Sequence, residues 1–309
     1  MRVMITGGLG FLGCAAAARL QAEGHDVRLM DVRDSGPRDS DYCQGSVLSS
    51  VDCVAACEGV DVVVHGAAIH QAQQVHRDPL AAIAINVKGT INLFNGALKA
   101  GARRFVFMSS AKVYGDPNEL PSAEYDALEP KETYALSKLA GEHHLRMNQA
   151  AADIEVVIIR PFSVYGPGQN LGSGYVGMVL ESLLGERRVD LPGERDYIRD
   201  FVHIDDVTRL SVAAITGASR SPVTIMNAGS GEAISLAQLA EYGSDIVGYD
   251  LPISFRTPGP ETLTRSHACL ELTADQFGYR PRYQVREGLT DTIEWFMSTN
   301  ARARKLGTR

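Results

Sequence analysis

Short apolar runs alternate with longer amphipathic stretches over the first half of the 309-residue chain. The apolar runs are rich in β-branched residues and predict buried strands at Arg2–Thr6, Asp26–Met30, Asp61–His65, Arg104–Met108 and Glu155–Arg160. The amphipathic stretches predict helices at Leu12–Glu23, Val51–Ala56, Pro79–Ala100 and Tyr134–Ala151. Strands and helices that alternate at this spacing imply parallel pairing. We therefore expect an α/β fold with a doubly wound parallel sheet, and a ligand site beyond the carboxyl ends of its strands.

The pattern changes after Arg160. The stretch Val164–Gly174 is rich in glycine and proline, and the later elements are short and separated by prolines. We expect residues 1–162 to form the main domain and residues 163–309 to form mainly a smaller substrate-binding lobe. Segments near residues 200–235 are expected to return to the main domain.

Composition excludes several classes of protein. The chain is 45% hydrophobic and 22% charged, with a net charge of −7 and no basic stripe, which argues against a nucleic-acid partner. The apolar start is far shorter than the roughly 20 residues that span a bilayer, so no membrane partner is expected. Five cysteines form no CxxC pair, which predicts a reduced, cytoplasmic setting and no metal site.

Three glycines follow the first predicted strand and open the first predicted helix. Gly7, Gly10 and Gly13 permit a tight turn, a close approach of the backbone to a pyrophosphate, and close packing of helix on strand. A phosphate then lies on the free N–H groups at the helix start. Glycines in this context predict a dinucleotide site.

A carboxylate ends the second predicted strand, 18 residues after Gly13. Asp31 can accept hydrogen bonds from the adenosine ribose hydroxyls and repels a 2′-phosphate, which favours NAD over NADP. Arg33 is the opposing observation, because an arginine near this point can hold that phosphate.

The candidate catalytic groups are a tyrosine, a lysine and a serine. Tyr134 and Lys138 are four residues apart and share one face of a predicted helix, where the ammonium can draw the phenol toward its ionised form. Ser109 and Ser110 end the strand Arg104–Met108, where a hydroxyl can hydrogen-bond the reacting oxygen. With the glycine turn and the acidic residue, these groups predict hydride transfer.

The order of these motifs resembles the extended short-chain dehydrogenase/reductases, in the group of NAD-dependent nucleotide-sugar epimerases and dehydratases. The resemblance covers nearly the whole chain. It rests on Gly7–Gly13, Asp61–Ala68, Asn86–Thr90, Met108–Gly115, Tyr134–Lys138, Arg160–Gly168, Arg199–Val207, Asn227–Gly231 and Phe277–Pro281.

The resemblance implies a Rossmann-like domain that binds NAD, a nucleotide-diphosphate sugar as substrate, and Ser110 as the catalytic hydroxyl. It implies cofactor contacts from Gly7, Gly10, Phe11, Leu12, Gly13, Asp31, Ser46, Val47, Ala67, Ala68, Asn86, Ser109, Tyr134, Lys138 and Pro161. It implies substrate contacts from His70, Lys112, Ser163, Arg199 and Arg256. Arg199 resembles the arginine that contacts the nucleotide diphosphate, a use suited to a planar cation.

Three positions depart from the family pattern on the nucleotide side. Ser46 stands where an aspartate usually contacts adenine, and Ser163 replaces an asparagine that often binds the diphosphate. Thr257 stands where an arginine often contacts the substrate, although Arg256 is adjacent. These departures leave open the possibility of an unusual substrate.

Ala111 and Lys112 are the most informative departure. The 4,6-dehydratases have Asp-Glu at these positions, and the decarboxylases tend to have glutamate at the second, so both reactions fit poorly. Lys112 can donate to a sugar hydroxyl or carboxylate, or can point to solvent. His70 has the same two interpretations, a substrate contact or a solvated loop residue.

The leading hypothesis is an NAD-dependent nucleotide-sugar epimerase that acts at C4, with C2 left open by Lys112. The alternatives are a sugar or cyclitol dehydrogenase with net redox, then a dehydratase or decarboxylase, and last a non-catalytic NAD-binding sensor. Fold alone licenses none of these. By analogy with the family, the helices Pro79–Ala100 and Tyr134–Ala151 are expected to form a homodimer interface, with close packing of Ala81, Ala82, Ala84, Ala135 and Ala140.

Overall fold

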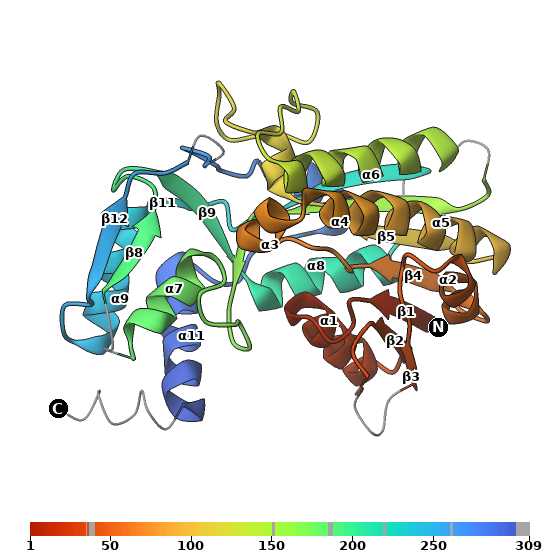
Figure 1. Cartoon of the computed structure of the whole chain (residues 1–309), viewed down its shortest axis with the longest axis horizontal. Helices are drawn as coiled ribbons and strands as arrows, with labels where there is room; N and C mark the ends of the chain where they lie inside the picture. Colours follow the sequence, from red (N-terminus) through yellow and green to blue (C-terminus); the bar gives the residue numbers. More distant parts are fainter. Residues whose placement is uncertain are drawn as a thin grey trace.

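The computed structural model describes residues 1–34, 36, 41–149, 152–184, 188–218, 221–259 and 262–300. A large parallel sheet with helices on both faces makes up one part of the molecule, and a smaller part with two short sheets lies beside it (Figure 1). The end of the predicted helix Tyr134–Ala151 lies outside the described residues.

The main sheet has seven strands in the order β10-β6-β5-β4-β1-β2-β3, and every neighbouring pair is parallel. The strands are β1 (Arg2–Thr6), β2 (Asp26–Asp31), β3 (Asp41–Gln44), β4 (Val62–His65), β5 (Arg104–Met108), β6 (Glu155–Pro161) and β10 (Val223–Ala228). The strand order reverses between β1 and β4, which is the point where a ligand crevice opens in such sheets. The predicted doubly wound sheet is confirmed.

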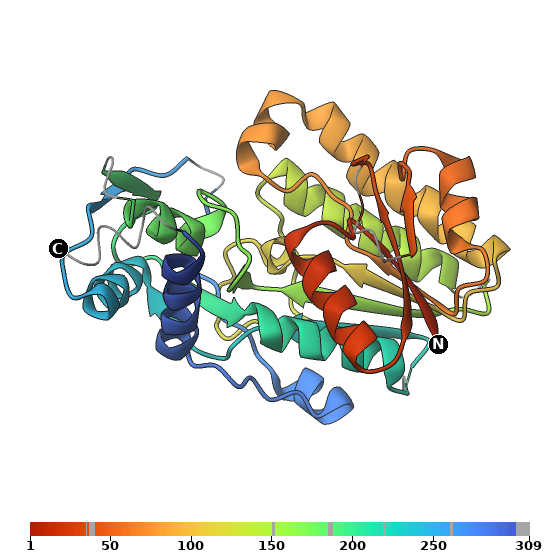
Figure 2. The same cartoon turned by 90° about the horizontal axis from the view of Figure 1, so that it is seen from below.

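Side chains that alternate along each strand build a separate core on each face of the sheet. In β1, Val3 and Ile5 pack under one set of helices and Met4 packs under the other. Figure 2 shows the two layers of helices on opposite sides of the strands. The first layer contains α1 (Phe11–Ala22) and α8 (Ile204–Thr216), and the second contains α2 (Ser50–Cys57), α5 (Gly89–Lys99) and α6 (Thr133–Gln149).

The predicted helix Pro79–Ala100 is three consecutive helical segments. Asp78 caps α4 (Pro79–Ile83) by accepting a hydrogen bond from the Ala81 N–H, a π-helical turn (Ala84–Lys88) follows, and α5 continues from it. Such turns add one residue to a helical turn and are common at functional sites. Asn86 lies in this turn and is buried.

Two further elements of the main domain were not predicted. The edge strand β3 carries no apolar run, and α3 (Ala72–Arg77) is a six-residue polar helix, so neither has the periodicity that reveals an element.

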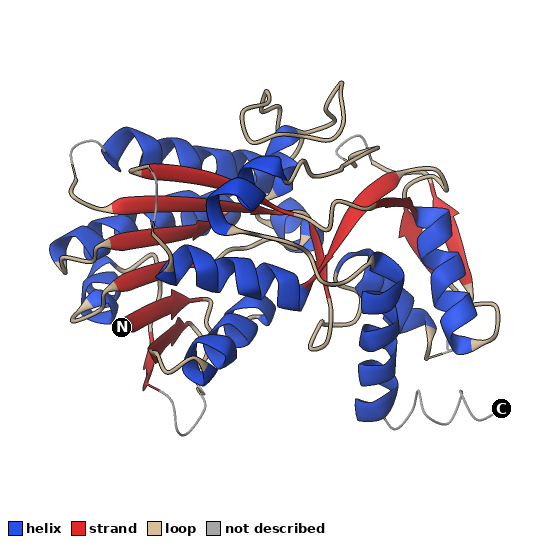
Figure 3. Ribbon diagram, turned by 180° about the vertical axis from the view of Figure 1, so that it is seen from behind, coloured by secondary structure: helices blue, strands red, loops and turns tan. Residues whose placement is uncertain are grey.

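The smaller part has its own core. Its strands are β7 (Ser163–Tyr165), β9 (Ile198–His203) and β11 (Ala233–Ser235) in one sheet, and β8 (Val189–Pro192) and β12 (Ile253–Arg256) in another. Its helices are α7 (Gly174–Ser182), α9 (Leu236–Val247) and α11 (Val285–Thr299), which lie beside these short strands in Figure 3. The helix α10 (Glu271–Phe277) packs back on β10 and α8 of the main part.

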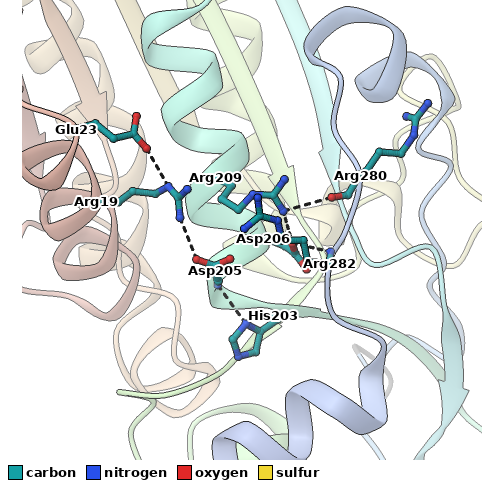
Figure 4. Close-up of polar contacts among 8 residues, drawn as sticks. All are labelled: Arg19, Glu23, His203, Asp205, Asp206, Arg209, Arg280 and Arg282. Carbon is teal, nitrogen blue, oxygen red and sulfur yellow. Dashed lines mark hydrogen bonds and ion pairs between the residues drawn. The ribbon is translucent and has the colours of Figure 1, made fainter.

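Charged residues at the start of α8 join the two parts (Figure 4). The His203 side chain caps the helix by accepting from the Asp205 N–H, and Asp205 forms an ion pair with Arg19 of α1 at 3.1 Å. Asp206 is fully buried and accepts from the backbone N–H groups of Arg282 and Tyr283. The run Arg199–Val207 therefore links β9, α1 and the segment that precedes α11.

No helix in the described ranges is both long enough and apolar enough to cross a membrane. The same ranges contain no group of three or more His, Cys, Asp or Glu side chains arranged to hold a metal ion.

Candidate active site

The glycine turn after β1 forms a narrow cradle. Gly7 has φ +65°, and a Cβ there would lie 2.9 Å from the Ala67 nitrogen. A Cβ on Gly13 would overlap the carbonyl oxygen of Gly7. Gly10 precedes α1, so no side chain caps the helix, and its first turn holds no acidic residue. The free N–H groups and the dipole of α1 therefore face an open cradle that fits a pyrophosphate.

Asp31 ends β2 beside this cradle. Its carboxylate accepts from the Leu9 N–H at 3.2 Å and from the Arg33 N–H at 3.3 Å. The Arg33 guanidinium pairs with the same carboxylate at 3.3 Å. Burial alone would raise the pKa of Asp31, but the hydrogen bonds from Arg33 and Leu9 outweigh it and lower the pKa. Asp31 is therefore an anion, and the charge of Arg33 is directed to it.

Ser46 and Val47 lie on the turn between β3 and α2. The Ser46 N–H donates to Asp52 at 2.9 Å, and its hydroxyl accepts from the Leu48 N–H at 3.2 Å. Val47 is buried against Gly89, where a Cβ would lie 2.6 Å from a Val47 methyl group. Asp52, which sequence reasoning missed, thus fixes the turn that carries both predicted cofactor contacts.

A buried histidine joins β1, β4 and the turn that carries Asn86. Thr90 donates to the Asn86 carbonyl at 2.6 Å, so the Nε2–H of His65 donates to Thr90 at 3.0 Å. The Nδ1 of His65 then accepts from Thr6 at 2.8 Å, and the Thr6 oxygen accepts from the Ala67 N–H at 3.3 Å. Burial, then the Lys138 charge, lowers the pKa of His65 to about 3. A neutral ring in a single orientation therefore holds the Ala67 loop.

Asn86 clamps the same loop to the catalytic helix. Its side chain accepts from the Ile69 N–H at 2.8 Å and donates to the Ile69 carbonyl at 2.9 Å. It also donates to Ser137 at 2.9 Å, and Ser137 donates to the Tyr134 carbonyl at 2.7 Å. Sequence reasoning missed His65, Thr90 and Ser137, although each is a polar residue inside a predicted apolar strand or helix face.

Ser110, Tyr134 and Lys138 come together at the carboxyl edge of the sheet. Ser110 lies close enough to the hydroxyl of Tyr134 to favour its ionised form. Lys138 is buried and donates to the Met108 carbonyl at 2.7 Å, with its ammonium 6.0 Å from the centre of the Tyr134 ring. The Lys112 N–H donates to the Ser110 oxygen at 3.2 Å, which leaves the Ser110 proton free to point at another oxygen.

The electrostatics of this group depend on burial. Burial raises the pKa of Tyr134 above its ordinary value, and the hydrogen bond with Ser110 offsets part of that rise. Burial lowers the pKa of Lys138 to about 7, and the charge of Glu142 acts in the opposite direction. Lys138 therefore titrates near neutral pH, and the phenol of Tyr134 needs a nearby positive charge to lose its proton.

A buried ion pair lies behind the catalytic groups. Arg160 contacts Glu142 through two nitrogens, at 2.7 and 3.0 Å, and both side chains are 1% exposed. Ser109 donates to the same carboxylate, and Arg160 also donates to Tyr114 at 3.0 Å. Ser109 thus anchors the end of β5, and Ser110 beside it faces Tyr134. Sequence reasoning missed Glu142.

Lys112 and His70 lie beside the catalytic groups. Lys112 pairs with Glu132 at 2.6 Å, and its ammonium lies 5.9 Å from the centre of the Tyr134 ring. His70 is exposed in the loop that follows Ala68. Its pKa is lowered by loss of hydration and by the charge of Lys138.

The remaining predicted substrate residues lie in the smaller part of the molecule. Arg199 of β9 is buried and stacks on Tyr175 at 5.4 Å, with a hydrogen bond to its hydroxyl. Tyr175 donates to the Pro192 carbonyl at 3.0 Å, and Pro192 pairs with Arg256 on β12. Ser163 begins β7 and pairs with Phe201 of β9. These residues form a second group, separate from the catalytic one.

Comparison with known proteins identifies the family. The sequence profile described as the NAD dependent epimerase/dehydratase family matches residues 3–229. A UDP-glucose 4-epimerase of Mycolicibacterium smegmatis is 31% identical over 310 residues, covering 96% of this chain and 98% of that protein. The chain belongs to the NAD-dependent epimerase/dehydratase family.

Solved structures of similar proteins agree with this assignment. MoeE5 in complex with UDP-glucuronic acid and NAD superposes with a TM-score of 0.91 at 27% identity, over 97% of this chain and 100% of that one. The UDP-glucose 4-epimerase of Thermus thermophilus in complex with NAD gives 0.88 at 27% identity, with the same coverage. The predicted Rossmann-like fold, the NAD cofactor and the resemblance to extended short-chain dehydrogenase/reductases are confirmed, and the epimerase relatives bear out the predicted enzyme class.

This member of the NAD-dependent epimerase/dehydratase family has no carboxylate at positions 111 and 112. Ala111 is buried in the 3₁₀ turn Ala111–Tyr114, and Lys112 projects from it beside Tyr134. The nearest carboxylate to Lys112 among the described contacts is Glu132. It directly precedes α6 and accepts a hydrogen bond from the Lys112 ammonium.

Proposed function

We propose that this chain is a UDP-hexose 4-epimerase that keeps NAD bound and inverts one carbon without net redox change. The observation that carries the proposal is the group Ser110, Tyr134 and Lys138, assembled beside the glycine cradle, with no carboxylate at positions 111 and 112. UDP-glucose 4-epimerases recur among the relatives that align along nearly the whole chain.

The cradle of Gly7, Gly10 and Gly13 would hold the pyrophosphate of NAD, and Asp31 its adenosine ribose. Bound NAD supplies a reversible acceptor for hydride.

Residues of the chain transfer the proton and stabilise the charges that form. As a phenolate, Tyr134 takes the proton of the C4 hydroxyl while C4 loses hydride, and Ser110 donates a hydrogen bond to the oxygen that becomes a carbonyl. Protonated Lys138 stabilises the phenolate of Tyr134. The keto-sugar turns over in the pocket and receives the hydride on its other face. Tyr134 then returns the proton to the oxygen, so atoms and electrons balance.

The group around Arg199 supports a nucleotide-diphosphate substrate. Arg199 is a buried cation whose described acceptors are neutral, namely the carbonyls of Ile198 and Leu263 and the hydroxyl of Tyr175. A buried charge is costly without a counter-charge, and a diphosphate would supply one.

The test is to incubate the purified protein with UDP-glucose and UDP-galactose, with mass spectrometry and NADH absorbance as readouts. We expect an isomer of unchanged mass and no accumulation of NADH. Tyr134→Phe should lower kcat by about 10³-fold, because general acid–base catalysis contributes roughly 10²–10⁴-fold. Tyr125→Phe is the matched control, because Tyr125 is exposed on a nearby loop, and it should keep the wild-type rate.

Other products would contradict the proposal. Loss of two hydrogens with stoichiometric NADH would make the chain a dehydrogenase, and loss of one water would make it a dehydratase. A wild-type rate in Tyr134→Phe would contradict the proposed catalytic role of that residue.

We also propose a homodimer formed through α4 and α6. Ala82 and Ala135 are buried within the protein, so these two alanines cannot contact a second copy as predicted. The supporting observation is instead an exposed apolar row of larger side chains, Leu80, Ile83, Leu136 and Met147. Light scattering should give twice the monomer mass, and a monomer at micromolar concentration would refute the interface.

A cytoplasmic location is proposed as well. Its support is that all five cysteines are free, including the neighbours Cys53 and Cys57. Cell fractionation would test it, and recovery in a membrane or secreted fraction would contradict it.

A further inference from the structure

Lys112 is held firmly at its backbone, next to the catalytic serine. It lies in the 3₁₀ turn Ala111–Tyr114 that follows β5, and its N–H donates to the Ser110 oxygen at 3.2 Å. The turn is capped by Ser110 itself. The point from which the Lys112 side chain departs is therefore fixed relative to the reacting oxygen of the substrate.

The Lys112 side chain folds back over the catalytic tyrosine. Its ammonium lies 5.9 Å from the centre of the Tyr134 ring and 2.6 Å from Glu132. The Lys112 side chain is 45% exposed, whereas that of Glu132 is 13% exposed. A lysine that merely sought solvent would extend away from the ring. Glu132 keeps it over Tyr134, and takes one of its three N–H donors.

Two lysines, Lys112 and Lys138, lie near the ring of Tyr134. Lys138 is a second ammonium close to Tyr134 and His70, and its nearest acid, Glu142, is occupied by Arg160. Glu132 is thus the single carboxylate that the described contacts set against two lysines. A cationic amino group on the sugar would be repelled by Lys112 and, when it is protonated, by Lys138, whereas a carboxylate would be attracted.

We propose that Lys112 binds a carboxylate carried by the sugar, so that the site takes a nucleotide-linked sugar acid of the hexuronic class. This inference rests on the proposed epimerase function and adds the chemistry of its sugar. The remaining N–H donors of Lys112 supply charge-assisted hydrogen bonds to that carboxylate. Glu132 limits the strength of the site, because it competes with the carboxylate for the same ammonium.

The experiment measures Kd and kcat/KM of the NAD-loaded protein for UDP-glucuronic acid and for UDP-glucose. The wild type should prefer the acid. Lys112→Met should lower the acid-to-neutral ratio by about 10- to 100-fold, the effect of losing one hydrogen bond between charged groups. Glu132→Gln should raise the ratio, because Lys112 would then face the substrate without a competitor.

Lys131→Met is the matched control. Lys131 precedes Glu132 in the chain, is similarly exposed, and forms its own ion pair with Asp116 at 2.8 Å. It changes the net charge by the same amount as Lys112→Met, so its acid-to-neutral ratio should stay at the wild-type value. An equal fall in both variants would reduce the effect to general electrostatics and overturn the inference.

The failures of the two proposals are distinguishable. A wild type that epimerises UDP-glucose, and binds it more tightly than UDP-glucuronic acid, would overturn the sugar-acid inference and leave the epimerase intact. Absence of turnover with both sugars would refute the proposed function. The Kd ratio of wild type and Lys112→Met would still decide whether Lys112 recognises the carboxylate.

Discussion

The catalytic edge of the main sheet and the groups proposed to face the substrate hold their charges in opposite ways. At the catalytic edge, Arg160 is paired through two nitrogens with Glu142, and Glu142 also accepts from Ser109. All three side chains are buried. On the substrate side, Arg256 ends an edge strand and is exposed, and Lys112 is half-exposed with one carboxylate partner. The first arrangement is complete without a ligand, and the second is not.

We propose that this difference separates two functions. Hydride and proton transfer need a geometry fixed to fractions of an ångström, which buried and fully paired groups provide. Sugar and nucleotide recognition needs charges whose partners arrive with the ligand. Arg199 illustrates the second case, because it is buried among neutral acceptors and has charge to offer.

The largest expected effect breaks the paired side of this comparison. Glu142→Gln should lower the free energy of unfolding by about 3–5 kcal/mol, because it leaves the buried Arg160 charge without its counter-charge. Chemical denaturation of the two proteins measures the difference. The fall in the free energy of unfolding should be several fold larger than the fall caused by removing an exposed ion pair.

Asp245→Asn is the control for this effect. Asp245 pairs with Arg286 at 3.0 Å, but both side chains are about half exposed. Its loss should change the free energy of unfolding by about 0–1 kcal/mol, as for other exposed pairs. Equal losses in Glu142→Gln and Asp245→Asn would show that burial does not separate the two kinds of charge.

The sequence predicted the parts of the fold that repeat a simple pattern. The strand Arg104–Met108 has the predicted bounds, because four consecutive buried apolar side chains follow Arg104. The predicted helix Pro79–Ala100 was right in extent, but its π-helical turn was not foreseen. One extra residue in a turn leaves the helical periodicity almost unchanged, so the pattern does not reveal it.

The candidate site divides in the same way. Glycine and Tyr/Lys spacings carry their own geometry, so Gly7, Tyr134 and Lys138 were predicted from spacing together with the strand, helix and serine around them. His65 and Glu142 were not, because their importance lies in partners that are distant in sequence, such as Thr90 and Arg160. The match between two distant side chains exists only after folding.

The smallest expected effect concerns an exception on the cofactor side, the pair of the 55%-exposed Arg33 side chain with the 10%-exposed Asp31 side chain. Asp31→Asn removes the negative charge that repels a 2′-phosphate and releases the Arg33 guanidinium. We expect the preference for NAD over NADP to fall by about 10- to 100-fold, or roughly 1.4–2.7 kcal/mol, as measured from the Kd of each cofactor. The glycine cradle is unaffected, so NAD binding should weaken but persist.

The double variant Asp31→Asn with Arg33→Met isolates the contribution of the arginine. If Arg33 provides the new phosphate contact, NADP affinity gained in the single variant should be lost again in the double variant. If both variants bind NADP equally well, loss of repulsion alone accounts for the change. Arg33 would then belong with the residues whose charge is already satisfied within the chain, as Arg160 is, rather than with those that await a ligand.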